Sequence, residues 1–182
     1  FFSAGGEAVE NAIKIARYYT KRPALITFTN GYHGRSYMGM ALSARMVPFK
    51  QGFGPFPGDI FRLPFPDDFH CVTLDDTKRA FELLFRSDCP PDQIAAIFFE
   101  PVQGEGGYNI ATLEFIEYLR KLCDEHGIIM VADEIQSGMG RTGKMFAMEH
   151  FGIDPDLTCV GKSIGGGLPI SGIVGKADII DN

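Results

Sequence analysis

Short apolar runs alternate with longer amphipathic segments along this chain. The apolar runs predict buried strands at residues 24–28, 94–99, 128–132, 157–160 and 171–175. The amphipathic segments predict helices at residues 7–20, 35–44, 75–86 and 112–127. Because buried strands that alternate with helices form a mainly parallel sheet, the pattern predicts an α/β fold with helices on both faces of the sheet.

The first helix and the longest irregular segment carry the clearest local signals. Along residues 7–20 one helical face is apolar and the opposite face is charged; the apolar positions are Val9, Ala12, Ile13, Ala16 and Tyr19. This face is expected to pack on the core, and Pro23 is expected to end the helix. Residues 46–70 are rich in Pro and Gly and predict a loop. A loop of this length is expected to serve function or an interface.

Functional side chains follow four of the predicted strands. They are the segment 32–35, Glu100, Asp133 and Lys162. Because ligands of parallel sheets bind beyond the carboxyl ends of the strands, these groups are expected to meet at one edge. A desolvated lysine has a lowered pKa and can form a Schiff base with an aldehyde, while an aspartate can pair with a pyridinium nitrogen. Lys162 and Asp133 therefore predict a site for pyridoxal phosphate.

Gly5 and Gly6 directly precede the first helix, so free backbone N–H groups are expected to bind the phosphate there. The alternative is a nucleotide hydrolase, in which Asp133 and Glu134 would bind a metal and residues 161–163 would form the phosphate loop. That loop needs a glycine five residues before Gly161, where this chain has Asp156. The spacing therefore argues against the alternative, and no metal site is expected.

Composition narrows the class of protein. The chain has 182 residues, 45% hydrophobic content and a mean hydropathy of +0.01, which predicts one globular domain. The net charge of −6 gives no basic stripe for nucleic acid, and charged residues interrupt every candidate membrane span. The four cysteines form no CxxC pair and are expected to be reduced.

The chain begins with Phe1 and is expected to be an internal piece of a longer protein. Its cysteine usage favours a cytoplasmic location, or the mitochondrial matrix if the source is eukaryotic.

Five motifs together resemble a known family. Residues 4–12, 32–35, 100–107, 132–143 and 161–163 resemble, in order and spacing, the class III pyridoxal phosphate aminotransferases. Residues 52–58 are similar to the branch of that family that acts on 4-aminobutyrate. The resemblance implies the large domain of a fold-type I enzyme, of which residues 1–182 would be the central part. The N-terminal segment and the C-terminal domain would be missing, and the piece alone is expected to be inactive.

The resemblance also implies roles at the cofactor. Lys162 would be the Schiff-base lysine and proton shuttle, and Asp133 would pair with the ring nitrogen. Gln136 would bind the ring hydroxyl, Ile135 would pack beneath the ring and Tyr32 would stack above it. Gly5 and Gly6 would bind the phosphate. The chain departs from the family at Ala4, where a serine is usual, so one hydroxyl donor is lost.

For the substrate, the resemblance implies that Arg35 clamps a distal carboxylate. Glu105 would act as a gate that pairs with an arginine outside the chain, Glu100 would line the pocket, and His33 would be structural. The implied reaction moves the amino group of an ω-amino acid, with 4-aminobutyrate as the expected donor, to 2-oxoglutarate by a ping-pong mechanism in a homodimer. Acetylornithine or ornithine aminotransferases and class III aminomutases remain alternatives, as does an inactive scaffold of the same fold.

Overall fold

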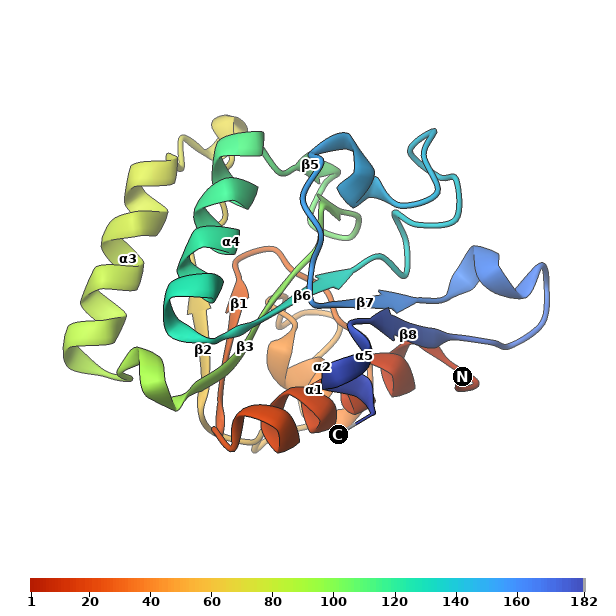
Figure 1. Ribbon diagram of the computed structural model, residues 1–182, viewed down its shortest axis with the longest axis horizontal. Coiled ribbons are helices and arrows are strands. Elements are labelled where there is room, and N and C mark those ends of the chain that lie inside the picture. Colours follow the sequence, from red (N-terminus) through yellow and green to blue (C-terminus); the bar gives the residue numbers. More distant parts are fainter. Residues whose placement is uncertain (182) are drawn as a thin grey trace.

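A computed structural model describes residues 1–181 as one mixed sheet between two layers of helices (Figure 1). The six strands follow the order β2-β1-β3-β6-β7-β8, and every neighbouring pair is parallel except β7 and β8. The strands are β1 (Ala24–Phe28), β2 (Ile60–Leu63), β3 (Ile94–Phe99), β6 (Ile129–Asp133), β7 (Leu157–Val160) and β8 (Gly172–Gly175). The predicted α/β class and mainly parallel sheet are confirmed.

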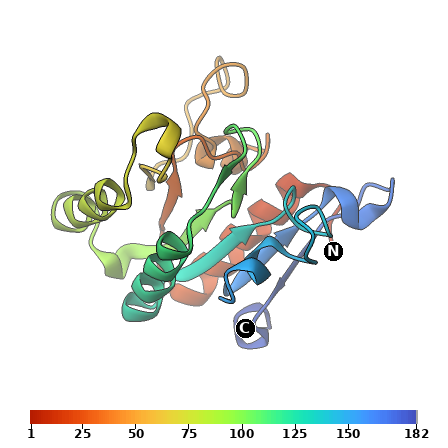
Figure 2. The same ribbon diagram turned by 90° about the horizontal axis from the view of Figure 1, so that it is seen from above.

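Helices cover both faces of this sheet, as Figure 2 shows from above. The helices are α1 (Gly5–Thr20), α2 (Tyr37–Leu42), α3 (Leu74–Ser87), α4 (Leu113–His126) and α5 (Ala177–Ile180). Alternate residues of each central strand point to opposite faces, so Phe28 packs with the layer of α3 and α4 while Leu25 packs with α1. Two apolar cores result, one on each side of the sheet.

Short elements connect these layers. A two-stranded antiparallel hairpin, β4 (Val102–Gln103) and β5 (Asn109–Ile110), follows β3. Single 3₁₀ turns lie at Asp68–His70, Pro91–Gln93, Ala147–His150 and Lys162–Gly165. Among the described residues no helix is long and apolar enough to cross a membrane.

Capping residues explain where α3 and α4 begin. Thr73 caps α3, with its hydroxyl accepting from the N–H of Asp76, so this helix begins just before the acidic pair from which it was predicted. Thr112 caps α4 in the same way, and Gly127, in the left-handed region with a φ of 63°, ends that helix. The predicted boundaries of α4 are confirmed.

Three local predictions were wrong. The helix predicted at 35–44 is confined to Tyr37–Leu42, because Ser36 caps it and leaves Arg35 outside. The loop predicted at 46–70 contains β2, a four-residue edge strand with prolines and glycines before it and prolines after it. Tyr19, placed on the buried face of the first helix, is exposed.

Candidate active site

The carboxyl ends of β1, β3, β6 and β7 border a cavity of about 350 Å³. The sequence predicted that the groups following these strands would converge, and the structure brings them to this one cavity. The lining residues are Gly5, Gly6, Tyr32, His33, Gly34, Arg35, Glu100, Asp133, Ile135, Gln136 and Lys162. This set contains every predicted site residue except Glu105.

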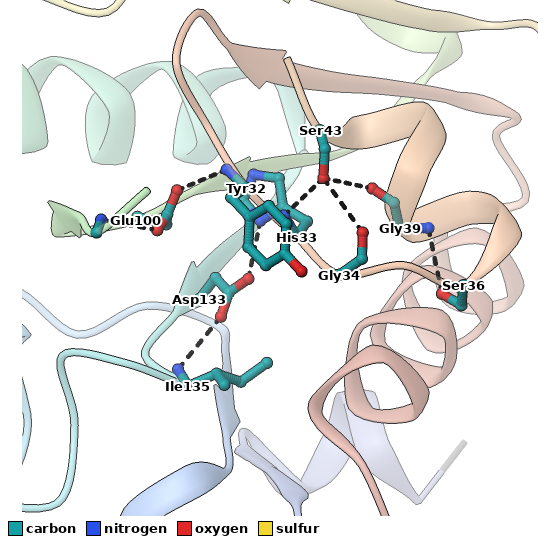
Figure 3. A network of polar contacts seen from close by, with 10 residues as sticks. Tyr32, His33, Gly34, Ser36, Gly39, Ser43, Glu100, Asp133 and Ile135 are labelled. Atoms are coloured by element: carbon teal, nitrogen blue, oxygen red, sulfur yellow. Dashed lines mark hydrogen bonds and ion pairs between the residues drawn. The ribbon is translucent and has the colours of Figure 1, made fainter. Parts of the chain in front are cut away.

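Two of the lining residues, His33 and Asp133, form a buried ion pair (Figure 3). The Nδ1 atom of His33 lies 2.8 Å from Oδ2 of Asp133, although the two residues are separated by 100 positions in the chain. The other carboxylate oxygen of Asp133 accepts from the N–H of Ile135 at 3.2 Å. Burial lowers the pKa of His33, but the hydrogen bond and the charge of Asp133, together with Glu100, outweigh it, and the pKa is raised.

His33 was expected to be structural only, yet its imidazole contacts the carboxylate that was predicted to serve the cofactor. Its backbone N–H donates to Oγ of Ser43 at 2.9 Å, and its ring meets Phe98 edge to face at 6.2 Å. The backbone and the ring of His33 are therefore both held in place beside Asp133. The sequence signal for His33 was that it directly follows Tyr32, a predicted site residue. Its contact with Asp133 could not be predicted, because it depends on how the strands pair.

Glu100 is a second buried carboxylate beside this pair. Its oxygens accept from the N–H groups of Tyr32 at 2.8 Å and Gly104 at 3.2 Å. Burial raises the pKa of Glu100 to about 7, with the charge of His33 opposing the rise and that of Asp133 adding to it. Glu100 thus ties the segment that carries Tyr32 to the hairpin that follows β3.

The raised pKa of Glu100 predicts a pH-dependent stability. A carboxyl whose pKa is raised on folding stabilises the fold fully below its unfolded pKa, and this contribution is lost as the pH rises through about 7. Relative to a Glu100→Gln variant, the wild-type apoprotein should lose roughly 3 kcal/mol of unfolding free energy between about pH 4 and pH 8. Denaturant titrations of both proteins across this range measure the difference. A difference that does not change with pH would contradict the prediction.

The amino end of α1 closes another side of the cavity. Helix α1 begins at Gly5, so the N–H groups of Gly5 and Gly6 have no partner within the helix, and both residues line the cavity. A methyl group on Gly5 would lie only 2.9 Å from Cδ1 of Ile135, and one on Gly161 would lie 3.2 Å from Cγ2 of the same residue. Glycine at both positions therefore lets the backbone close around the Ile135 side chain.

Lys162 also lines this cavity. It lies two residues beyond β7, at the start of a 3₁₀ turn with a φ of 45°, and its Nζ donates to Oε1 of Gln136. The prediction that this amine is desolvated was wrong. The turn places Lys162 beyond the end of the buried strand, and its side chain is exposed. Lys162 and Gln136 also line an adjoining cavity of about 290 Å³ that reaches Arg141 and Ser163.

Arg35 and Tyr32 lie at the cavity rim around Phe49. The guanidinium carbon of Arg35 lies 5.5 Å from the centroid of the Phe49 ring, and Tyr32 meets the same ring at 5.0 Å. Arg35 is exposed and can turn toward a ligand. Glu105 is exposed on the turn between β4 and β5, which carries it away from both cavities, and only its backbone carbonyl is held, by Arg45 at 3.3 Å.

The arrangement can hold a flat phosphorylated pyridine ring. Asp133 can supply a carboxylate for a ring nitrogen, Lys162 an amine for an aldehyde, and the start of α1 N–H groups for a phosphate. The clash that a methyl group on Gly5 would cause shows how closely the backbone approaches Ile135 at this point. The residues present therefore fit pyridoxal phosphate.

Comparison with known sequences matches the chain to one family along its whole length. The model of the family described as Aminotransferase class-III matches residues 1–182. The 5-aminovalerate aminotransferase DavT of Pseudomonas aeruginosa is 52% identical over 179 residues, which cover 98% of this chain and 42% of that protein. The 4-aminobutyrate aminotransferase GabT of Escherichia coli is 48% identical with the same coverage. The chain spans about two fifths of the length of these relatives.

Solved structures give the same result for the fold. A PLP-bound amine transaminase from an uncultivated Pseudomonas species superposes with a TM-score of 0.90 at 30% identity, covering 99% of this chain and 44% of that one. A transaminase from the marine bacterium Virgibacillus superposes with a TM-score of 0.91 at 29% identity, covering 99% of this chain and 41% of that one.

Proposed function

Because the chain belongs to the class III aminotransferases, we propose that the protein containing it transfers the amino group of an ω-amino acid to 2-oxoglutarate with pyridoxal phosphate as cofactor. The observation that carries this proposal is the placement of Asp133 and Lys162 on one cavity with the amino end of α1. A non-catalytic scaffold of the same fold would not require this combination of carboxylate, amine and anion-binding N–H groups. We further propose that residues 1–182 form the central part of the large cofactor-binding domain.

Pyridoxal phosphate, when bound, supplies an aldehyde that takes up amino groups and a protonated pyridine ring that withdraws electrons. Asp133 holds the proton at the ring nitrogen, since it is a buried carboxylate that lines the cavity. His33 orients that carboxylate through Nδ1. Lys162 holds the aldehyde end and then moves a proton at the reacting substrate carbon. Gln136, which accepts from Lys162, binds the ring hydroxyl in this proposal.

The remaining cofactor contacts follow from the walls of the cavity. Ile135 lies against Gly5 and supports one ring face, while Tyr32 at the rim covers the other. The N–H groups of Gly5 and Gly6 bind the phosphate at the positive end of the α1 dipole. Glu100 holds Tyr32 through its backbone N–H.

The curated relatives support an ω-amino acid as the donor. Their names give 5-aminovalerate and 4-aminobutyrate as substrates, and these two molecules differ by a single methylene. Both carry a carboxylate far from the reacting amine, which Arg35 at the cavity rim can bind with two parallel hydrogen bonds. In a ping-pong cycle the donor leaves as its oxo product before 2-oxoglutarate binds. The pairing of Glu105 with an arginine stays a prediction.

A homodimer is also part of the proposal. Several large apolar side chains are exposed in the loop between α2 and β2, and they support an interface at this face. They are Met46, Val47 and Phe53.

Arg35→Lys tests the choice of donor. Lysine keeps the positive charge but cannot form the two-pronged contact with a carboxylate, so kcat/KM for 4-aminobutyrate should fall about ten- to a hundredfold. Cofactor binding should persist, because Arg35 is exposed at the rim and is not placed at either the phosphate or the ring nitrogen.

The deciding comparison uses an amine of similar length that lacks the carboxylate. The variant should react with this control amine as well as the wild type does. If Arg35→Lys weakens both donors equally, Arg35 supports the fold or the cofactor, and its proposed contact with the substrate must be abandoned.

A further inference from the structure

Thr27 lies in β1, one residue before the strand ends, and is fully buried. Within residues 1–181 its hydroxyl has no hydrogen-bond partner, which is unusual because buried hydroxyl groups are nearly always paired. Thr77, another fully buried threonine, shows the ordinary arrangement, with its hydroxyl donating to the carbonyl of Pro64 at 3.0 Å. The hydroxyl of Thr27 therefore points to a ligand that is not a protein group.

The space beside Gly31 lies between Thr27 and His33. A methyl group on Gly31 would lie 3.3 Å from Nε2 of His33, 3.7 Å from Oγ1 of Thr27 and 3.1 Å from the carbonyl oxygen of Phe28. The side of Gly31 is thus crowded by three polar atoms, which brings Oγ1 of Thr27 and Nε2 of His33 near each other beside the glycine. Buried water molecules occupy such positions, because each typically makes two to four hydrogen bonds to groups that lack other partners.

We propose that a buried water molecule bridges Nε2 of His33 and Oγ1 of Thr27, and that Thr27 thereby acts as a positioning residue for the His33–Asp133 pair. The water site follows from residues of this chain alone. Its importance for catalysis rests on the proposed function, in which Asp133 serves the ring nitrogen.

The bridge favours the protonated form of His33. Since Nδ1 of His33 faces the carboxylate of Asp133, the N–H at Nδ1 is donated there, and Nε2 is the nitrogen left to face the water. The water can donate to a neutral Nε2 or accept from a protonated one, but the hydrogen bond from the charged imidazolium is the stronger of the two, so the bridge stabilises that form. This agrees with the charges around His33, because Asp133 and Glu100 raise its pKa whereas burial and Arg62 lower it.

Thr27→Val removes the hydroxyl and keeps the branched shape, so it should lower the pKa of His33 by about 0.5–1 pH unit, the size expected for one hydrogen bond. The measurement is the pH titration of the His33 imidazole N–H resonance, which a short contact to a carboxylate moves downfield of the amide protons. It uses the full-length protein with and without pyridoxal phosphate. His33→Asn assigns the resonance.

Two variants separate this role from general packing. Thr27→Ser keeps the hydroxyl and should keep the wild-type titration midpoint, while Thr77→Val should lower the thermal unfolding midpoint and leave the titration unchanged. A Thr27→Val midpoint equal to or above that of the wild type, or a Thr27→Ser midpoint that falls as far as that of Thr27→Val, would overturn the bridge. Because the resonance is followed without cofactor as well, a failure of the bridge is distinguishable from a failure to bind pyridoxal phosphate.

Discussion

Replacing Lys162 with alanine is expected to lower kcat/KM for transamination by at least about 10³-fold. The variant loses both the amine that holds the aldehyde and the group that moves the proton at the substrate carbon. The phosphate contacts at the start of α1 remain, so pyridoxal phosphate should still bind, but without a covalent link to the protein. Steady-state kinetics and the absorbance spectrum of the bound cofactor measure the two effects.

Lys144→Ala is the matched control for this variant. Lys144 is an exposed lysine that follows the glycine-rich segment 138–143, and it lines neither cavity. Its replacement should leave both the rate and the cofactor spectrum unchanged. If Lys162→Ala keeps a wild-type spectrum and more than about a tenth of the wild-type rate, another residue must hold the aldehyde.

Asp133→Asn is expected to lower kcat by about 10²- to 10⁴-fold while the cofactor stays attached to Lys162. A neutral amide has nearly the same shape as the carboxylate but cannot hold the proton at the ring nitrogen. The electron-withdrawing power of the ring is therefore lost, whereas the phosphate and aldehyde contacts are not. Rapid mixing with 4-aminobutyrate, followed by the absorbance of the cofactor, measures the first half-reaction directly.

Glu134→Gln provides the control for charge at the end of β6. Glu134 is also buried, but its carboxylate faces away from the cavity and accepts from the N–H groups of Ala147 at 2.6 Å and Met148 at 3.0 Å. Its replacement should lower thermal stability more than it lowers kcat. Equal losses of kcat in the two variants would indicate that Asp133 acts through the local fold and not through the ring nitrogen.

Much of this fold follows from local sequence signals. The strands β1, β3 and β7 were predicted with their observed bounds, because each is a short apolar run that ends at a polar or glycine residue. Strand β2 was missed although three of its four residues are apolar, because it is only four residues long and lies among prolines and glycines, which are typical of loops.

The residues of the site were more predictable than their contacts. Asp133 and Lys162 could be located because chemistry in a parallel sheet gathers at the carboxyl ends of its strands. The contact between His33 and Asp133 could not, because it depends on how β1, β3 and β6 are paired. The same holds for Thr27 and for the raised pKa of Glu100, since both arise from burial in three dimensions.

Borohydride reduction followed by peptide mapping tests the proposed function most directly. The full-length protein loaded with pyridoxal phosphate is reduced, which fixes the cofactor on the lysine that holds it, and the labelled peptide is then sequenced. The label should be found on Lys162, in the peptide that follows β7. A label on any other lysine, or the absence of a label from a protein saturated with cofactor, would contradict the assignment of this cavity as the active site.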